Sequence, residues 1–280
     1  MMRLAISNIA WQPTESERIY PLIAEAGVSG LEIAPGLAFA NAIDPFCPTR
    51  AELSHFRRQM DSHRLKLVSM QAILFGASNA LLFGDSAART AFRTGLERAI
   101  VLADKLEIPN IVMGSPRNRA IPAEMERAEA ERIACDVFRK LGDMAQAAGT
   151  RLALEPNPEA YGTNFLTSTK ETIAFAGLVD HPAVTLNFDL GAMRMNGEIG
   201  RAKDLCRRGA LLISHVHVSE PHLSPAPHRQ SAFGIIARDL IRHGYSGWFS
   251  IEMHRIGEDN RDNIRARVEA CSRQLRMAMA

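Results

Sequence analysis

The sequence predicts a single (β/α)8 barrel that spans residues 1–280. Short apolar runs rich in Ile, Val and Leu alternate with longer amphipathic stretches from one end of the 280-residue chain to the other. This alternation is the pattern of repeated βα units around a parallel sheet. A chain of this length suits one such barrel or two smaller doubly wound domains. Eight apolar runs without a linker-like segment between them favour the single barrel.

The predicted strands are Arg3–Trp11, Gly30–Pro35, Lys66–Ile73, Asn110–Pro116, Arg151–Asn157, Val184–Gly191, Leu211–Glu220 and Gly247–His254. A helix is expected after each strand. Thr14 and Glu17 have the spacing of a capping box at the start of the first helix, and Gly27 ends that helix. The longest helices are predicted at Ala87–Leu106 and Pro122–Ala148.

Composition and charge exclude several classes of function. The chain has 33 Lys and Arg residues, 31 Asp and Glu residues and a net charge of +2, without a basic run long enough to bind a polyanion. Nucleic acid is therefore not an expected partner. The four cysteines form no CxxC pair, so neither a thiolate metal site nor a disulfide framework is indicated. No segment approaches the roughly 18 apolar residues of a membrane span, and we expect a cytoplasmic protein without membrane contact.

Four polar side chains stand near the ends of the last four predicted strands, about one βα unit apart: Glu155, Asp189, His217 and Glu252. In a (β/α)8 barrel the active site lies at the carboxyl ends of the strands. Three carboxylates and an imidazole that converge there would repel one another and be costly to bury without a cation. The set predicts one divalent metal ion, with Mn²⁺ favoured and Mg²⁺, Co²⁺ and Zn²⁺ also compatible.

Each of these residues also has an ordinary structural interpretation. A single acidic residue at a strand end often caps a helix or pairs with a cation, and a strand histidine is often a hydrogen-bonded core residue. The common register of all four favours the metal site. In "ISHVHVSEP", alternation places His215 on the same side of the strand as His217 but two residues deeper. We expect His215 to support the metal site or to face the substrate.

The order of these strand-end motifs resembles a known family. The segments "LEP", "FDLG", "HVHVSE" and "HGYSGWFSIEMH" look like those of the xylose isomerase-like TIM barrels. The branch they resemble most is that of the sugar isomerases and epimerases, which includes ketose 3-epimerases and inosose dehydratases. The resemblance covers essentially the whole chain. It implies a metal held by Glu155, Asp189, His217 and Glu252, of which the first and last also act as the acid/base pair in the epimerases. It also implies that the chain can form homo-oligomers.

The resemblance therefore implies a divalent-metal-dependent sugar isomerase or epimerase. Such an enzyme removes a proton next to a carbonyl, and the cation stabilises the enediolate that forms while two carboxylates remove and return the proton. Two departures from the ketose epimerase pattern remove sugar-contacting groups. Ala192 stands in place of a histidine and Tyr161 in place of a second glutamate, which weakens the case for 3-epimerisation of a free ketose.

Three alternatives stay open from the sequence. A dehydratase or lyase that acts on a keto-polyol or keto-inositol would begin with the same proton abstraction. A zinc-dependent abasic-site endonuclease of the same superfamily needs additional histidines, but this chain has Gln71, Gly114, Ser115 and Ala192 at the corresponding strand ends. A barrel that binds sugar without catalysis is the third alternative.

Further residues around the predicted mouth are candidates for contact with a small sugar or sugar-derived polyol. They lie at or just after strand ends and are Trp11, Glu32, Gln71, Ser115, Asn157, His215, His228, Arg229 and His254. Trp11 could either stack on a carbohydrate or plug the barrel. Arginines could clamp a phosphate or carboxylate, so a phosphorylated or acidic sugar is also compatible. The arginines placed for this are Arg117, Arg119, Arg194 and Arg229.

The segment Phe75–Asp85 has glycines near both of its ends, and its Leu81, Leu82 and Phe83 are expected to be exposed. This composition is typical of a lid that excludes water from an active site. A loop that is packed on the barrel rim would have the same composition. The sequence leaves both interpretations open.

Overall fold

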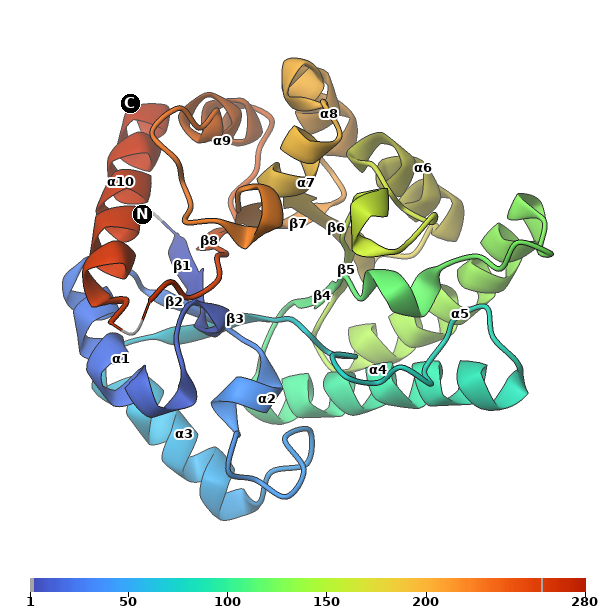
Figure 1. Cartoon of the computed structure of the whole chain (residues 1–280), viewed down its shortest axis with the longest axis horizontal. Coiled ribbons are helices and arrows are strands. Elements are labelled where there is room, and N and C mark those ends of the chain that lie inside the picture. The colour runs from blue at the N-terminus through green and yellow to red at the C-terminus, as the bar shows by residue number, and fades with distance from the viewer. Residues whose placement is uncertain (1–2, 258) are drawn as a thin grey trace.

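The computed structural model describes residues 3–257 and 259–280, and these form a closed barrel of parallel strands (Figure 1). The strands are β1 Leu4–Ser7, β2 Gly30–Ile33, β3 Lys66–Met70, β4 Ile111–Met113, β5 Leu152–Leu154, β6 Val184–Asp189, β7 Ile213–Val218 and β8 Trp248–Ile251. Each strand pairs with the next in chain order, and β8 closes the barrel against β1. The predicted (β/α)8 barrel is confirmed, with every strand inside its predicted range.

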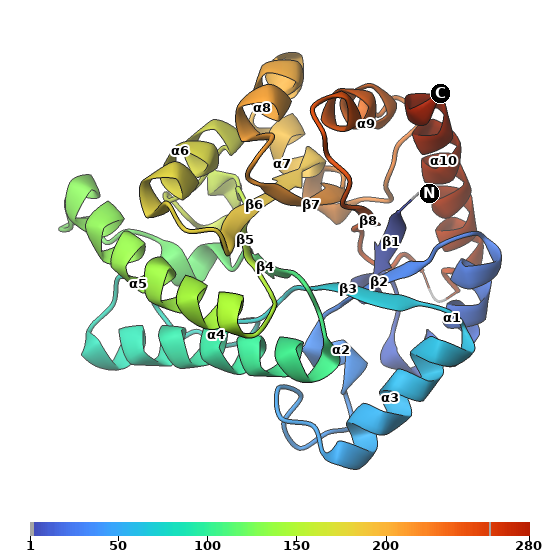
Figure 2. The ribbon, with the colours of Figure 1, turned by 180° about the vertical axis from the view of Figure 1, so that it is seen from behind.

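A ring of longer helices surrounds the strands, as both faces of the molecule show (Figures 1 and 2). These helices are α1 Ser16–Glu25, α3 Arg50–Ser62, α4 Ser86–Leu106, α5 Arg127–Ala147, α6 Thr169–Val179, α8 Ala202–Gly209, α9 Phe233–Arg242 and α10 Arg261–Met279. The shorter helices α2 Pro35–Ala38 and α7 Leu190–Met195 follow the carboxyl ends of β2 and β6. Among the described residues, no helix combines the length and apolar character that crossing a bilayer would require.

The strands are buried on both faces, which explains their runs of Val, Ile and Leu. Two irregularities interrupt the parallel register: one shift lies between Leu31 and Glu32 in the β2–β3 pair, and the other lies between Leu186 and Asn187 in the β6–β7 pair. Such shifts re-aim the side chains that follow them. Both occur directly before a polar residue whose side chain points toward the site described below.

Two details of the predicted helices are wrong. The capping box at the start of the first helix involves Gln12 and Glu15 around a 3-10 turn at Pro13–Glu15, rather than Thr14 and Glu17. Pro13 explains the difference, because its fixed φ suits the first position of a helical turn. The helix predicted to begin at Pro122 begins at Arg127, after a separate turn.

Part of the segment Phe75–Asp85 is packed against the protein, through Ala80, Leu82 and Phe83, while Phe75 is 93% exposed. Leu82 and Phe83 are only 1% and 3% exposed, so the prediction that they are exposed is wrong, whereas Leu81 is exposed as expected. Asn118 explains the packing, because its side-chain amide donates to two carbonyl oxygens of the loop and its own carbonyl oxygen accepts from the Leu82 amide. These bonds tie the middle of the segment, from Ala77 to Leu82, to the turn that follows β4.

Candidate metal centre

Four side chains converge at the carboxyl ends of β5 to β8. Glu155 and Glu252 directly follow β5 and β8, Asp189 ends β6, and His217 is the penultimate residue of β7. Each offers one ligand atom, and these four atoms all lie within 4.8 Å of one another. The structure therefore brings together the four residues that the strand-end pattern singled out.

The His217 ring stands at the centre of this group. Its Nδ1 lies 2.9 Å from Glu155 Oε1, 3.2 Å from Glu252 Oε2 and 3.5 Å from Asp189 Oδ2. The histidine is fully buried, and the three carboxylates are largely buried. Nδ1 is thus the ring nitrogen that faces the oxygen donors.

A fifth residue, Glu32 of β2, lies behind the imidazole. Its two carboxylate oxygens are 3.1 and 3.2 Å from His217 Nε2, and its Oε2 is 2.8 Å from His215 Nε2. Gln71 Nε2 donates to Glu32 Oε1 at 2.8 Å. A carboxylate that binds one ring nitrogen of a histidine orients the other toward a metal. Glu32 therefore fixes the direction of His217 Nδ1.

The two glutamates of the cluster differ in their hydrogen bonds. Glu155 Oε1 accepts from Asn187 Nδ2 at 2.8 Å, and Glu155 Oε2 accepts from Asn157 Nδ2 at 2.9 Å. Asp189 Oδ2 similarly accepts from the Ser219 hydroxyl at 2.7 Å. In the described part of the chain, the carboxylate of Glu252 has one close polar contact, with His217.

Gly114, directly after β4, makes room for the Glu155 carboxylate. A Cβ atom at position 114 would lie 2.5 Å from Glu155 Oε2, which is closer than real Cβ contacts. Any side chain at this position, including the histidine that a three-zinc site would use, would displace Glu155. At the end of β4, Gly114 therefore leaves to the Glu155 carboxylate the space that a side chain would occupy.

The same environment shifts the pKa values of the two glutamates in opposite directions. Burial raises the pKa of Glu252 to about 7, against the lowering effect of His217 and with the added repulsion of Glu155 and Asp189. The pKa of Glu155 lies below its ordinary value. Burial acts to raise it, but the hydrogen bond to His217, the charge of that ring and the Asn157 hydrogen bond outweigh burial.

The pKa of His217 lies well above its ordinary value, although burial lowers it, because Glu252 and Glu32 stabilise the imidazolium. Burial raises the pKa of Glu32, but the two histidines bring that pKa well below its ordinary value. A positive charge is therefore strongly favoured among these carboxylates. The donor set of three carboxylates and one imidazole nitrogen fits one divalent cation.

Three of the predicted substrate-contacting residues lie in the shell that supports this cluster. Gln71 and His215 contact Glu32, and Asn157 contacts Glu155.

Trp11 is 2% exposed, and its indole Nε1 donates to the Ser16 hydroxyl. The structure therefore places Trp11 as a core residue rather than as a stacking surface. His228, Arg229 and His254 are exposed after β7 and β8, and their contact with a substrate stays a prediction.

The arginines expected to clamp an acidic group differ in availability. Arg119 is fully buried, so it cannot reach a ligand directly. Arg194 Nε pairs with Glu220 Oε2 at 3.3 Å, while Arg117 and Arg229 are exposed. A role for the last two in binding a phosphate or carboxylate stays a prediction.

Several supporting residues were not among the sequence-based candidates, and strand alternation could have found them. Asn187 stands two residues before Asp189, and Ser219 stands two residues after His217. Residues two apart on a strand share a face. The supporting groups therefore follow the same period of two as the ligands.

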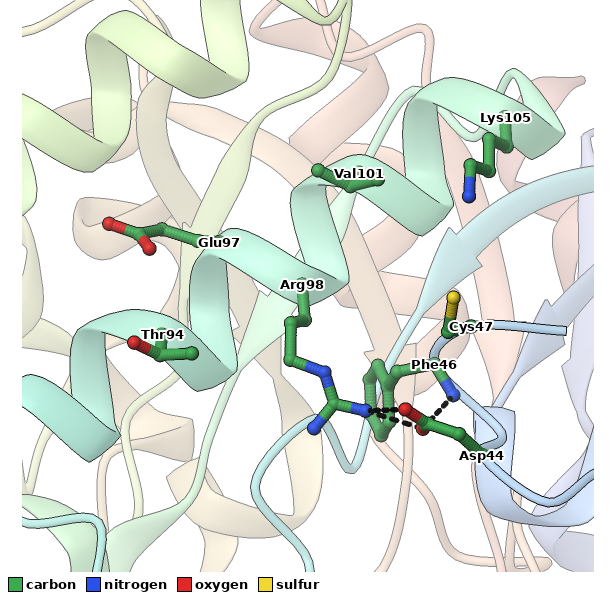
Figure 3. Close-up of a pocket in the computed structure, with 8 residues that line it drawn as sticks. All are labelled: Asp44, Phe46, Cys47, Thr94, Glu97, Arg98, Val101 and Lys105. Atoms are coloured by element: carbon green, nitrogen blue, oxygen red, sulfur yellow. Dashed lines mark hydrogen bonds and ion pairs between the residues drawn. The ribbon is translucent and has the colours of Figure 1, made fainter.

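A surface pocket of about 330 Å³ lies apart from this cluster, along α4 (Figure 3). It is lined by Asp44, Phe46, Cys47, Thr94, Glu97, Arg98, Val101 and Lys105. Arg98 pairs with Asp44, and its guanidinium carbon lies 5.5 Å from the centroid of the Phe46 ring. The pocket shares no residue with the candidate metal centre.

Residues 21–274 match a family model described as xylose isomerase-like TIM barrel. No curated protein sequence matches the chain. The solved structure of an L-ribulose 3-epimerase superposes with a TM-score of 0.82 at 18% identity, over 100% of this chain and 96% of that one. D-Allulose 3-epimerase from Methylomonas sp. in complex with D-allulose gives a TM-score of 0.78 at 18% identity, over 98% and 97% of the two chains. An AP endonuclease, family 2, from Brucella melitensis gives a TM-score of 0.73 at 19% identity, over 94% and 97%.

Proposed function

The chain belongs to the xylose isomerase-like TIM barrel family, and from this premise we propose that it is a divalent-metal-dependent sugar isomerase or epimerase. The observation that carries the proposal is the convergence of Glu155, Asp189, His217 and Glu252 within 4.8 Å at the carboxyl ends of the strands. Two 3-epimerases with the same fold, one of them in complex with D-allulose, support a small sugar or sugar-derived polyol as the substrate.

We propose that these four residues hold one divalent ion, with Mn²⁺ as the first candidate and Mg²⁺, Co²⁺ or Zn²⁺ also suited to the donors. The bound ion would stabilise the negative charge that develops on a carbonyl oxygen when the neighbouring carbon loses a proton. His217 contributes Nδ1, and Glu32 holds the ring from the opposite side.

Glu155 and Glu252 are the proposed acid/base pair, one for each face of the substrate. Both carboxylates lie beside the same imidazole nitrogen, so a substrate bound at the cluster would lie within reach of both. In the metal-free site the Glu252 carboxylate contacts His217 alone among the described polar groups and has a raised pKa, so we assign proton abstraction to Glu252. Glu155 is held by amide donors and is suited to return a proton at a fixed position.

A panel of ketoses, aldoses, keto-inositols and their phosphates, incubated with the protein and Mn²⁺ in D₂O and followed by NMR, tests this proposal. Deuterium that enters one carbon of one sugar, and fails to enter after chelation of the metal, would establish both the reaction and its site. A metal-loaded protein that exchanges no proton of any compound would contradict the proposal.

The same panel separates the alternatives. A dehydratase would begin with the same proton abstraction, but the hydroxyl on the adjacent carbon would then leave as water while a double bond forms between the two carbons. A three-zinc endonuclease is disfavoured by Gly114, where any side chain would collide with Glu155, and by the small net charge of +2. Duplex DNA binding with a steep salt dependence would revive it.

A further inference from the structure

We propose that Arg119 is a positioning residue that acts through Asn157 to hold the Glu155 carboxylate in one orientation at the metal centre. The catalytic meaning of this inference rests on the proposed function. The arrangement itself is a matter of hydrogen bonds and metal binding, and it can be measured without a substrate.

Arg119 ends the 3-10 helix Pro116–Arg119 that follows β4, and its side chain is 0% exposed. Its Nη2 lies 2.7 Å from the backbone oxygen of Glu155 and 2.7 Å from Asn157 Oδ1. Its Nη1 lies 3.5 Å from the backbone oxygen of Met113. Burial lowers the pKa of Arg119 to about 10, so the guanidinium is charged at neutral pH. A buried charge is costly unless it is compensated, and here its hydrogen-bond acceptors are neutral oxygens around Glu155.

The direction of the Asn157 amide follows from Arg119. A guanidinium can only donate hydrogen bonds, so the atom of Asn157 that faces it must be the oxygen. The amide nitrogen must then face the other way, where it lies 2.9 Å from Glu155 Oε2. Arg119 thereby sets Asn157 as a donor to Glu155, and its positive charge also attracts that carboxylate.

The other side of Glu155 is closed by a second donor and by a glycine. Asn187 Nδ2 donates to Glu155 Oε1 at 2.8 Å, and Gly114 leaves just enough room beside Oε2. A carboxylate with a donor on each oxygen cannot rotate without breaking both bonds. If Arg119 only tied the loop after β4 to β5, breaking its bond to Asn157 would not change the affinity for a metal ion.

The variant Asn157→Asp separates the two roles. The new carboxylate still accepts from Arg119, so the buried guanidinium keeps its partner and the fold keeps this bond. The donor to Glu155 is replaced by an oxygen that repels Oε2. We expect Mn²⁺ titration at pH 8, followed by electron paramagnetic resonance, to show an affinity about 10-fold to 100-fold weaker than that of the wild type, the usual effect of losing a partner of a metal ligand.

Asn110→Asp is the matched control. Asn110 is also buried, and its amide donates to Ser69 Oγ at 3.0 Å and accepts from Ser214 Oγ at 2.8 Å. It directly precedes β4 and contacts none of the four candidate ligands, so the same chemical change should leave Mn²⁺ affinity at the wild-type value. A folded Asn157→Asp variant with wild-type affinity, or an equal loss in both variants, would overturn the proposal.

Two variants of Arg119 complete the test. Arg119→Lys keeps the charge, but it lacks the planar fork with which Arg119 reaches Met113, Glu155 and Asn157 together, so its Mn²⁺ affinity should lie between those of the wild type and Arg119→Met. If Arg119→Met does not fold, the Lys and Asp variants decide the question. A wild-type protein that binds no divalent ion would overturn this proposal, whereas a protein that binds Mn²⁺ but exchanges no sugar proton would contradict the proposed function alone.

Discussion

Glu155 and Glu252 stand at equivalent heights on the same barrel, yet their surroundings differ. Glu155 accepts from two asparagine amides and lies beside a glycine that leaves its carboxylate little room to move. Glu252 has one close polar contact among the described residues, with the shared His217. Burial acts on both, but only Glu252 ends with a raised pKa, at about 7.

The difference shows that burial alone does not set the chemistry of a carboxylate. Hydrogen bonds to the charged form favour ionisation, and their absence leaves desolvation and neighbouring carboxylates to dominate. Two glutamates with pKa values pushed apart are the arrangement that acid/base catalysis uses. Glu155 is therefore the better anchored carboxylate, and in the proposed function Glu252 is the better placed proton acceptor.

The largest expected effect comes from Glu252→Gln. An amide oxygen can still approach the cation but is a very poor proton acceptor, so metal should remain while proton exchange on the substrate falls by about 10² to 10⁴-fold. Glu155→Gln should also lose exchange. Its new amide would meet the donors of Asn157 and Asn187, so this variant should in addition bind Mn²⁺ more weakly than Glu252→Gln does.

Exchange of substrate protons measured by NMR, beside Mn²⁺ titration of each variant, checks this pair. Glu198→Gln is the control, because Glu198 is also buried but accepts from the backbone amides of Thr169 and Lys170 and is not one of the cluster residues. Fully metallated Glu155 and Glu252 variants that exchange protons at nearly the wild-type rate would show that the two-carboxylate mechanism is wrong.

Glu32→Gln tests the imidazole that the two glutamates share. The amide cannot satisfy both His215 and His217 as the carboxylate does, so the direction of His217 Nδ1 should loosen. We expect Mn²⁺ affinity to fall by about 10-fold to 100-fold. Ser250→Ala, which removes a donor 3.5 Å from Glu32 Oε1, should have a much smaller effect. Equal affinities for wild type and Glu32→Gln would contradict the role assigned to Glu32.

The barrel and the four candidate ligands could be predicted from the sequence because both follow the regular spacing of βα units along the chain. Apolar runs at βα spacing determine the strands, and polar residues that end successive parallel strands must share one rim. The helix start at Pro13 and the packed loop at Leu82 could not be read in the same way. The first depended on a proline that favours a slightly earlier turn, and the second on Asn118, a residue distant in the sequence.

The supporting shell was only partly predictable. Asn187 shares a strand face with Asp189, so alternation could have identified it. Arg119 lies on a turn after β4, where no period applies, and its sequence neighbourhood suggested an exposed clamp for an acidic ligand. Only the three-dimensional structure shows that its side chain turns inward to Asn157.

Gly114→Ala should destabilise the protein by crowding the Glu155 carboxylate, without a contact to Glu252. The added Cβ would lie 2.5 Å from Glu155 Oε2, so the carboxylate must shift, and overpacking of this kind costs about 1–3 kcal/mol of unfolding free energy. Gly177→Ala, in the exposed interior of α6 with no atom within 4 Å of the new Cβ, should instead be neutral or stabilising by about 0.5–1 kcal/mol. Chemical denaturation of the metal-free proteins measures both. Equal stabilities would show that the space beside Glu155 is not tight.

A change in the slope of the pH dependence of Mn²⁺ binding should separate the two glutamates. In the metal-free protein burial lowers the pKa of His217, but Glu252 and Glu32 raise it well above its ordinary value, so a proton occupies the imidazole at neutral pH and must leave when Nδ1 binds a metal. Lower pH favours the protonated form, so Mn²⁺ affinity should fall by about tenfold per pH unit for each proton displaced.

Glu252, with its pKa at about 7, adds a second proton below that pH, whereas Glu155, with a lowered pKa, stays ionised there. The loss of affinity should therefore steepen below pH 7 in the wild type and, at a lower pH because the repulsion of Glu155 is gone, in Glu155→Gln, but not in Glu252→Gln. Calorimetric titrations in buffers of different ionisation enthalpy count the released protons. A steepening that survives in Glu252→Gln and disappears in Glu155→Gln would reverse the assignment of the two glutamates.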